Sequence, residues 1–297
     1  MTAITSEAHV VETSGFPGAS FGTSADGLPV ALVGDTAFAM VPGRDGRQFL
    51  ATGWRIGRPI EQWCRDDFYG HSGELADESE FRGRVAENAE HQREKRALGR
   101  REIRSSANTP WGPSQGATVY AEGVTAHSTA GHGGFHLSAE RNRKVNSMLR
   151  APGGWYEEDA AWAIVALTYP DLFTTYERRH ADLTVRGSWP DAWEAIFGCV
   201  LEPGESREKD RRAFELRHAD DWIVVSAILS DQQPGFTEVI AAKGGQRTEH
   251  TPVRRYLIPR DEYGISGCPF GFVIDPELHA VYDGPSSFVT WATRGPA

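Results

Sequence analysis

The turns at the centre of the chain constrain the fold most, because their glycines break any helix there. Glu122-Gly123 is a two-residue hairpin turn between segments 117–121 and 124–128, whose side chains alternate between two faces. Ala130-Gly131 turns the chain again, so residues 133–137 become a third strand. The sequence therefore predicts a three-stranded antiparallel meander.

Helices are expected on both sides of this meander. The longest, over residues 81–104, has no proline and is mostly polar, which is typical of a surface or connecting helix. Residues 156–169 predict a helix that opens with acids and is then uncharged, so we expect it to be buried nearly all round. Shorter helices are expected at 138–150, 171–183, 190–197 and 205–217.

The remaining regular segments resemble strands. Near the N-terminus they are a hairpin at 29–40 and a strand at 47–56, and near the C-terminus they are 222–229, 236–242, 253–258, 271–274 and 280–282. Helices followed by strands imply an α+β fold, with a central β-meander and packed helices before a C-terminal antiparallel β-sheet. The expected parts are a flexible N-terminal tail (1–28), an N-terminal region (29–104), a central domain (109–217) and a C-terminal sheet (218–297), which can pack with the central domain.

Composition favours a cytoplasmic protein. Hydrophobic residues make up 39% of the 297 residues, yet no apolar run reaches the length of about 18 residues that a membrane span needs. The N-terminus lacks the basic start and apolar stretch of a signal peptide. The three cysteines, Cys64, Cys199 and Cys268, are odd in number and far apart, which fits a reducing compartment and argues against a disulfide framework or a structural zinc ribbon.

Charge is uneven along the chain although the net charge is −10. Residues 61–80 contain seven acids against one arginine, whereas residues 91–104 contain six basic residues against two acids. The acidic stretch could bind a basic host protein by charge complementarity. The basic stretch could bind DNA, although the net charge disfavours direct nucleic-acid binding. The plain alternative is a solvated surface.

Three histidines, His127, His132 and His136, suggest a metal or proton-transfer site in the meander. On one strand, His132 and His136 would lie about 13 Å apart, too far to share an ion. The Ala130-Gly131 turn could instead bring His127 and His132 together, with a carboxylate from Glu157 or Glu158. The alternative is that the histidines are structural residues and that the acids simply favour a helix start.

These residues give the candidate site. We expect His127, His132 and Glu158 as catalytic residues, and His127, His132 and Glu157 as ligands of a divalent metal. The expected substrate-binding residues are Trp111, Gln115, Thr129 and Gly133.

A second reading has Ser128 or Thr129 as a nucleophile beside a histidine base. The chain has no G-x-S-x-G elbow, no G-x-x-x-x-G-K-[ST] loop and no G-x-G-x-x-G loop, so no known reaction motif supports either reading.

The motifs T-P-W-G from Thr109, H-S-T-A-G-H-G-G from His127 and W-Y-E-E-D from Trp155 resemble an uncharacterised domain family carried largely on bacterial plasmids and phages. The resemblance covers about residues 109–214, and segments 255–259 and 271–276 are similar to longer members. It implies a cytoplasmic accessory protein of a mobile element. We therefore expect a small His/carboxylate-site hydrolase or, alternatively, a non-enzymatic acidic inhibitor or adaptor that binds a host defence or nucleic-acid-processing protein.

Overall fold

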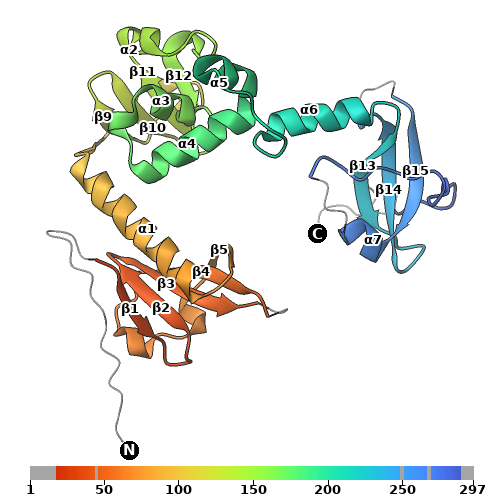
Figure 1. The fold of residues 1–297 in the computed structure, drawn as a ribbon, viewed down its shortest axis with the longest axis horizontal. Coiled ribbons are helices and arrows are strands. Elements are labelled where there is room, and N and C mark those ends of the chain that lie inside the picture. The colour runs from red at the N-terminus through yellow and green to blue at the C-terminus, as the bar shows by residue number, and fades with distance from the viewer. Residues whose placement is uncertain (1–17, 44–45, 248–250, 266–268, 289–297) are drawn as a thin grey trace, which may run out of the picture. The chain divides into compact units, whose positions relative to one another are not determined.

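A computed structural model describes residues 18–43, 46–247, 251–265 and 269–288 (Figure 1). The chain divides into two compact units, residues 1–185 and residues 186–297. Both contain helices and antiparallel sheets, which confirms the α+β prediction.

The first unit begins with a five-stranded antiparallel meander, in the order β1-β2-β3-β4-β5. The expected hairpin at 29–40 is confirmed, with Gly34 at φ +57° in its turn. The expected tail is wrong in part, because residues 20–23 pair with β2 as a strand. Residues 1–17 of that tail lie outside the described residues. The elements are β1 (Ser20–Thr23), β2 (Pro29–Val33), β3 (Thr36–Pro42), β4 (Gln48–Trp54), η1 (Ile60–Gln62), η2 (Arg65–Asp67) and β5 (Gly70–Leu75).

A single long helix, α1 (Glu78–Ala97), follows this sheet. Asp77 caps it by accepting a hydrogen bond from the N–H of Glu80 at 2.8 Å, which satisfies one of the free donors of the first turn. Only Phe81 and Val85 are buried, in the core of the N-terminal sheet, so the predicted polar character is confirmed. The helix ends earlier than predicted because Gly99 takes a φ of +58°.

The central sheet has the order β12-β11-β10-β9-β6, and its three middle strands are the predicted meander. Gly123, at φ +75°, makes the turn between β9 and β10. The two outer strands were not predicted, because each is only three residues long and depends on its neighbour for hydrogen bonds. The strands are β6 (Arg101–Ile103), β9 (Gly116–Ala121), β10 (Val124–Ser128), β11 (Gly133–Leu137) and β12 (Trp155–Glu157), and a separate small hairpin joins β7 (Asn108–Thr109) and β8 (Gly112–Pro113).

Helices pack on this central sheet, and α3 contacts β11 and β12 (Figure 1). The helix predicted at 156–169 is wrong at its start, since Trp155–Glu157 is a strand and α3 begins only at Trp162. Residues 163–166 are buried, as expected for the uncharged stretch. The remaining elements are α2 (Ala139–Lys144), η3 (Pro152–Gly154), α3 (Trp162–Thr168), η4 (Pro170–Leu172) and α4 (Thr175–Ser188), the last of which extends beyond Val185.

In its described residues the second unit contains the helices α5, α6 and α7 and a three-stranded antiparallel sheet around Val239, Tyr256, Ile258 and Ile274. Pro190 and left-handed Gly198 bound α5 as predicted. Segments 271–274 and 280–282 are not strands, because each makes only one isolated bridge, at Val273 and at Val281. The elements are α5 (Pro190–Phe197), α6 (Arg207–Arg217), β13 (Trp222–Leu229), β14 (Phe236–Lys243), β15 (Val253–Pro259) and α7 (Arg260–Ile265).

Two further expectations concern membranes and cysteines. Of the helices in the described ranges, none is both long and apolar enough to span a bilayer. Cys64 and Cys199 are free thiols, whereas Cys268 lies outside the described residues.

Candidate functional site

The turn between β10 and β11 fixes the backbone of His132. The N–H of Thr129 donates to the carbonyl of His132 at 2.9 Å, and the N–H of His132 donates to Thr129 Oγ1 at 3.2 Å. The hydroxyl of Thr129 also donates to the His132 carbonyl at 2.5 Å. Thr129 therefore shapes the turn through its side chain, and the imidazole of His132, 61% exposed, projects from it.

The end of β12 brings two acids to this turn. Glu157 lies opposite Gly134 on β11, and the N–H of Glu158 donates to the carbonyl of Gly133 at 3.0 Å. A Cβ at residue 133 would lie 2.5 Å from Glu158 Oε2 and 2.7 Å from the His127 carbonyl. Position 133 must therefore be glycine for the Glu158 carboxylate to lie this close to the backbone.

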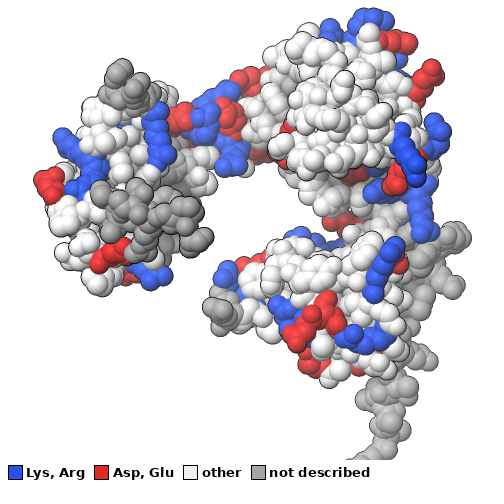
Figure 2. All heavy atoms as spheres, turned by 180° about the vertical axis from the view of Figure 1, so that it is seen from behind, with Lys and Arg blue, Asp and Glu red and all other residues white. Residues whose placement is uncertain are grey.

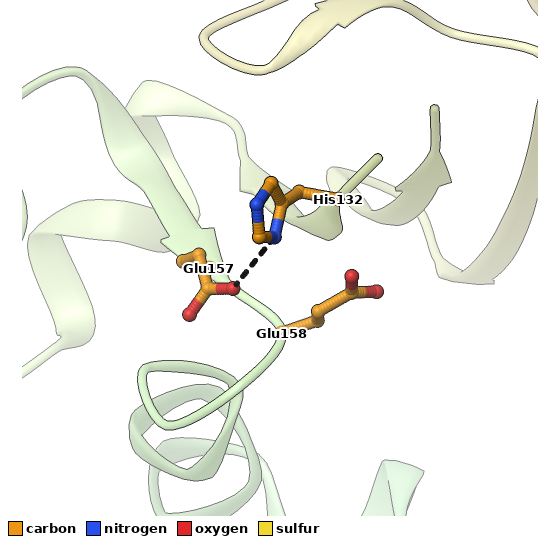
Figure 3. A group of neighbouring side chains, drawn as sticks. All are labelled: His132, Glu157 and Glu158. Carbon is orange, nitrogen blue, oxygen red and sulfur yellow. Dashed lines mark ion pairs between the residues drawn. The ribbon is translucent and has the colours of Figure 1, made fainter. Parts of the chain in front are cut away.

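His132, Glu157 and Glu158 form a cluster with the composition of a metal site (Figure 3). One ligand atom from each residue lies within 4.8 Å of the others, and His132 Nδ1 is 3.9 Å from Glu157 Oε1. Two ligands at about 2.1 Å from one ion are at most about 4.2 Å apart, so binding requires a shift of less than about 1 Å. Glu157 Oε1 is buried and has no hydrogen-bond partner among the described residues, which fits a cation as its partner.

His127 does not join this cluster, so the expected pairing of His127 with His132 is wrong. The ring of His127 contacts Ser114 Oγ through Nδ1 at 3.2 Å and lies 5.6 Å from the ring of Trp155. Burial, and then the nearby His136, lower the pKa of His127, so the folded state favours its neutral form. Strand alternation places the side chain of His127 on the sheet face opposite to that of Ser128 and Gly133.

Aromatic rings cover the sheet face that carries His127 and His136. Trp155 lies 4.4 Å from His136 and 5.8 Å from Trp111, measured between ring centroids. A Cβ on Gly134 would lie 2.4 Å from Trp111 Cη2, so the indole packs directly on that glycine. Trp111 is therefore a packing residue of this face.

Two other expected residues also have defined backbone roles. The N–H of Gln115 donates to the Ser128 carbonyl at 2.8 Å, and Gln115 is exposed. The Ser128 hydroxyl donates to the Gly116 carbonyl at 3.3 Å. Neither Trp111 nor Gln115 lines the cavity described next.

A cavity of about 780 Å³ lies between the opposite face of the central sheet and the segment from η4 to α4. Glu158 lines it, so one carboxylate of the cluster also borders the cavity. Its aromatic wall includes Tyr120, Phe135 and Phe173. The cluster thus lies beside a space large enough for a small-molecule substrate.

A buried ion pair supports the cavity wall, and no local pattern in the sequence predicts it. Arg100 donates to Glu177 Oε1 at 2.8 Å and to the Leu172 carbonyl at 2.8 Å, and its Cζ lies 4.1 Å from the ring of Tyr120. Burial alone would raise the pKa of Glu177, but hydrogen bonds from Arg100 and from the Thr174 N–H hold that pKa below its usual value. The partners are 77 residues apart, so only the fold brings them together.

The acidic and basic stretches are partly paired within the chain. Asp67 binds Arg58, Glu74 binds Arg47, and Glu80 binds Arg84. In the basic stretch, Arg93 binds Glu90 and Arg100 binds Glu177. On the face drawn in Figure 2, basic and acidic side chains are interspersed.

Comparison with known proteins bears on the central segment alone. Neither the curated proteins nor the solved structures gave a match to this chain. The resemblance to an uncharacterised family is confirmed for the segment that contains His132, Glu157, Glu158 and most of the cavity wall: residues 104–219 match the model of a family described as a domain of unknown function (DUF7007).

Proposed function

We propose that the central domain is a divalent-metal-dependent hydrolase, within a cytoplasmic accessory protein of a mobile element. The observation that carries the proposal is the convergence of His132, Glu157 and Glu158, the last of which borders the cavity. An imidazole with two carboxylates suits Mn²⁺, Fe²⁺ or Zn²⁺. The free thiols of Cys64 and Cys199 support the cytoplasmic location.

Each residue of the cluster has a role in this proposal. His132 and Glu157 hold the ion, and Glu158 completes the set while bordering the substrate space. A bound ion would polarise the bond to be cleaved and lower the pKa of a water molecule enough to make it a nucleophile at neutral pH. Hydrolysis adds the water oxygen to the electrophilic centre and breaks the bond to the leaving group. The Glu158 oxygen that does not bind the ion would accept the proton of that water and pass it to the leaving group.

Metal binding is the first test. The purified full-length protein, incubated with Mn²⁺, Fe²⁺ or Zn²⁺ and desalted, should retain about one ion per chain by elemental mass spectrometry. His132→Ala and Glu157→Gln should each weaken this binding by at least about 100-fold, since each removes one of three ligands. Gly133→Ala should weaken it too, because the added Cβ displaces Glu158.

Matched controls are His71→Ala and Asp159→Asn, two exposed positions outside the cluster, and both should keep the metal. Folded wild-type protein that retains none of the three ions would refute the proposal. If metal binds, the loaded protein should be assayed on a panel of nitrophenyl esters, amides and phosphate esters. Hydrolysis that is abolished by His132→Ala would then identify the bond type.

The inhibitor or adaptor alternative remains a prediction without a structural observation in its favour. Its expected acidic contact region includes Asp67 and Glu74, and both bind arginines of the same chain.

A further inference from the structure

The cavity beside the cluster extends across the whole central sheet. Glu102 on β6 and Glu158 after β12 both line it, and these strands form opposite edges of the five-stranded sheet. Four strand spacings separate the edges, which corresponds to about 19 Å. The cavity is therefore suited to an elongated ligand rather than to a compact one.

The charge of the cavity wall has one sign. Its charged residues are Glu102, Glu158 and Glu177, and its lining, all within the described part of the chain, includes no lysine or arginine. Arg100 is close by, and its guanidinium binds Glu177 and lies over the rings of Tyr120 and Phe173. Glu102 and Glu158 form no ion pair with a described residue, so at opposite ends of the cavity they repel an anionic ligand and attract a cationic one.

Aromatic rings form the wall between these two carboxylates. The ring centroids of Tyr120, Phe135 and Phe173 lie 4.9 to 5.7 Å from one another. Phe135 and Phe173 are buried, whereas Tyr176 on α4 is 37% exposed and lies 4.2 Å from the ring of His180. Aromatic faces together with carboxylates are the groups that proteins use to bind guanidinium and ammonium groups.

We propose that this cavity binds an elongated organic cation, with its guanidinium or ammonium group at the Glu102 end and its apolar body along the aromatic wall. As a statement about substrate, this deepens the proposed function: the hydrolysable bond would lie at the Glu158 end, beside His132 and Glu157. The cationic end and the reacting end are then about the width of the sheet apart.

The test compares two ligands of the same shape that differ in charge. Nα-benzoyl-L-arginine amide carries a guanidinium, and Nα-benzoyl-L-citrulline amide carries a neutral urea in its place. Calorimetric titration of the metal-free, full-length protein at low salt should show the arginine compound binding at least about fivefold more tightly, the preference that one ion pair at about 4 Å gives in water. Added salt should reduce that preference.

Variants then locate the cation. Glu102→Gln should remove most of the preference and leave citrulline binding unchanged. Glu122→Gln, an exposed acid in the β9–β10 turn and outside the cavity wall, is the matched control and should change neither. Equal binding of the two ligands, no binding of either, or equal effects of Glu102→Gln and Glu122→Gln would each overturn the proposal.

His132→Ala separates this proposal from the metal-dependent hydrolase. His132 does not line the cavity, so this variant should lose the metal and keep the preference for the arginine compound. If wild-type protein prefers the arginine compound but binds no metal, the cation site is supported and the metal-dependent hydrolase is refuted. If the protein binds metal but shows no preference for the arginine compound, the cation site is refuted and the metal site is supported.

Discussion

Replacing Arg100 should strongly destabilise the first unit, because its side chain forms a nearly buried ion pair. The side chains of Arg100 and Glu177 are 6% and 18% exposed, so their ion pair is nearly removed from water. The guanidinium also binds the carbonyl of Leu172 and lies against the ring of Tyr120. Arg100→Met would leave the Glu177 carboxylate buried without its cation, which costs about 3–5 kcal/mol of unfolding free energy.

Urea unfolding of the full-length protein, followed by tryptophan fluorescence, measures this loss. The double variant Arg100→Met/Glu177→Leu should recover most of it, because no charge is then left buried alone. Arg82→Met is the control: its pair with Glu78 is about half exposed, so the loss there should be below about 0.5 kcal/mol. A loss below about 1 kcal/mol for Arg100→Met, or a double variant no more stable than the single one, would refute the reasoning.

The same pair predicts a pH dependence. The pKa of Glu177 is lowered in the folded state, since the bonds from Arg100 and Thr174 outweigh burial. Its stabilising effect is therefore fully present above the unfolded pKa, about 4.3, and is lost as the pH falls through the lower folded value. In Arg100→Met, burial without the cation raises the pKa of Glu177, so the stability gap between wild type and this variant should begin to narrow above about pH 4.3 and continue to narrow down to the lowered pKa of wild type.

Two further predictions concern the central sheet. Gly134→Ala should lower the unfolding free energy by about 1–3 kcal/mol, because the new Cβ would lie 2.3 Å from the Tyr156 carbonyl. The control is Gly131→Ala, whose Cβ would have open space around it, so its unfolding free energy should not change. Similar thermal melts for the two variants would contradict this prediction. Burial lowers the pKa of His136, so the unfolded chain takes up the proton first, near pH 6.5, and stability should fall as the pH drops below that value. His136→Gln should flatten the melting temperature between pH 7.5 and 5.5, with exposed His71→Gln as the control, and an unchanged slope would count against it.

Local turn chemistry made much of the central fold predictable. Gly123 and the Ala130-Gly131 pair mark both turns of the meander, and the strands between them follow from alternation alone. Proline at 190 and glycine at 198 likewise fixed the bounds of α5. In each case the residues that determine the helix or strand lie within it or directly beside it in the sequence.

The parts that could not be predicted depend on distant partners. Glu157 and Glu158 follow an apolar pair and come before an uncharged stretch, so in sequence they resemble the first turn of a helix. In the structure residues 155–157 instead pair with β11 as a strand. The pairing with β11 also brings Glu157 Oε1 to 3.9 Å from His132 Nδ1. The sequence suggested Glu157 as a ligand from its residue type, and this geometry was not part of that prediction. The contact of His127 with Ser114 depends on the path of the segment before β9, which lies outside the predicted strands.

The position of β6 has a practical consequence for expressing the central domain. Residues 101–103 pair with β9, and Arg100 precedes them directly, whereas the family match begins at residue 104. A fragment cut at that boundary would expose the outer edge of β9 as a site for aggregation and strand exchange between chains. A fragment meant to keep the cavity intact must begin upstream of Arg100, so the segment shared with the family is shorter than the segment that can fold.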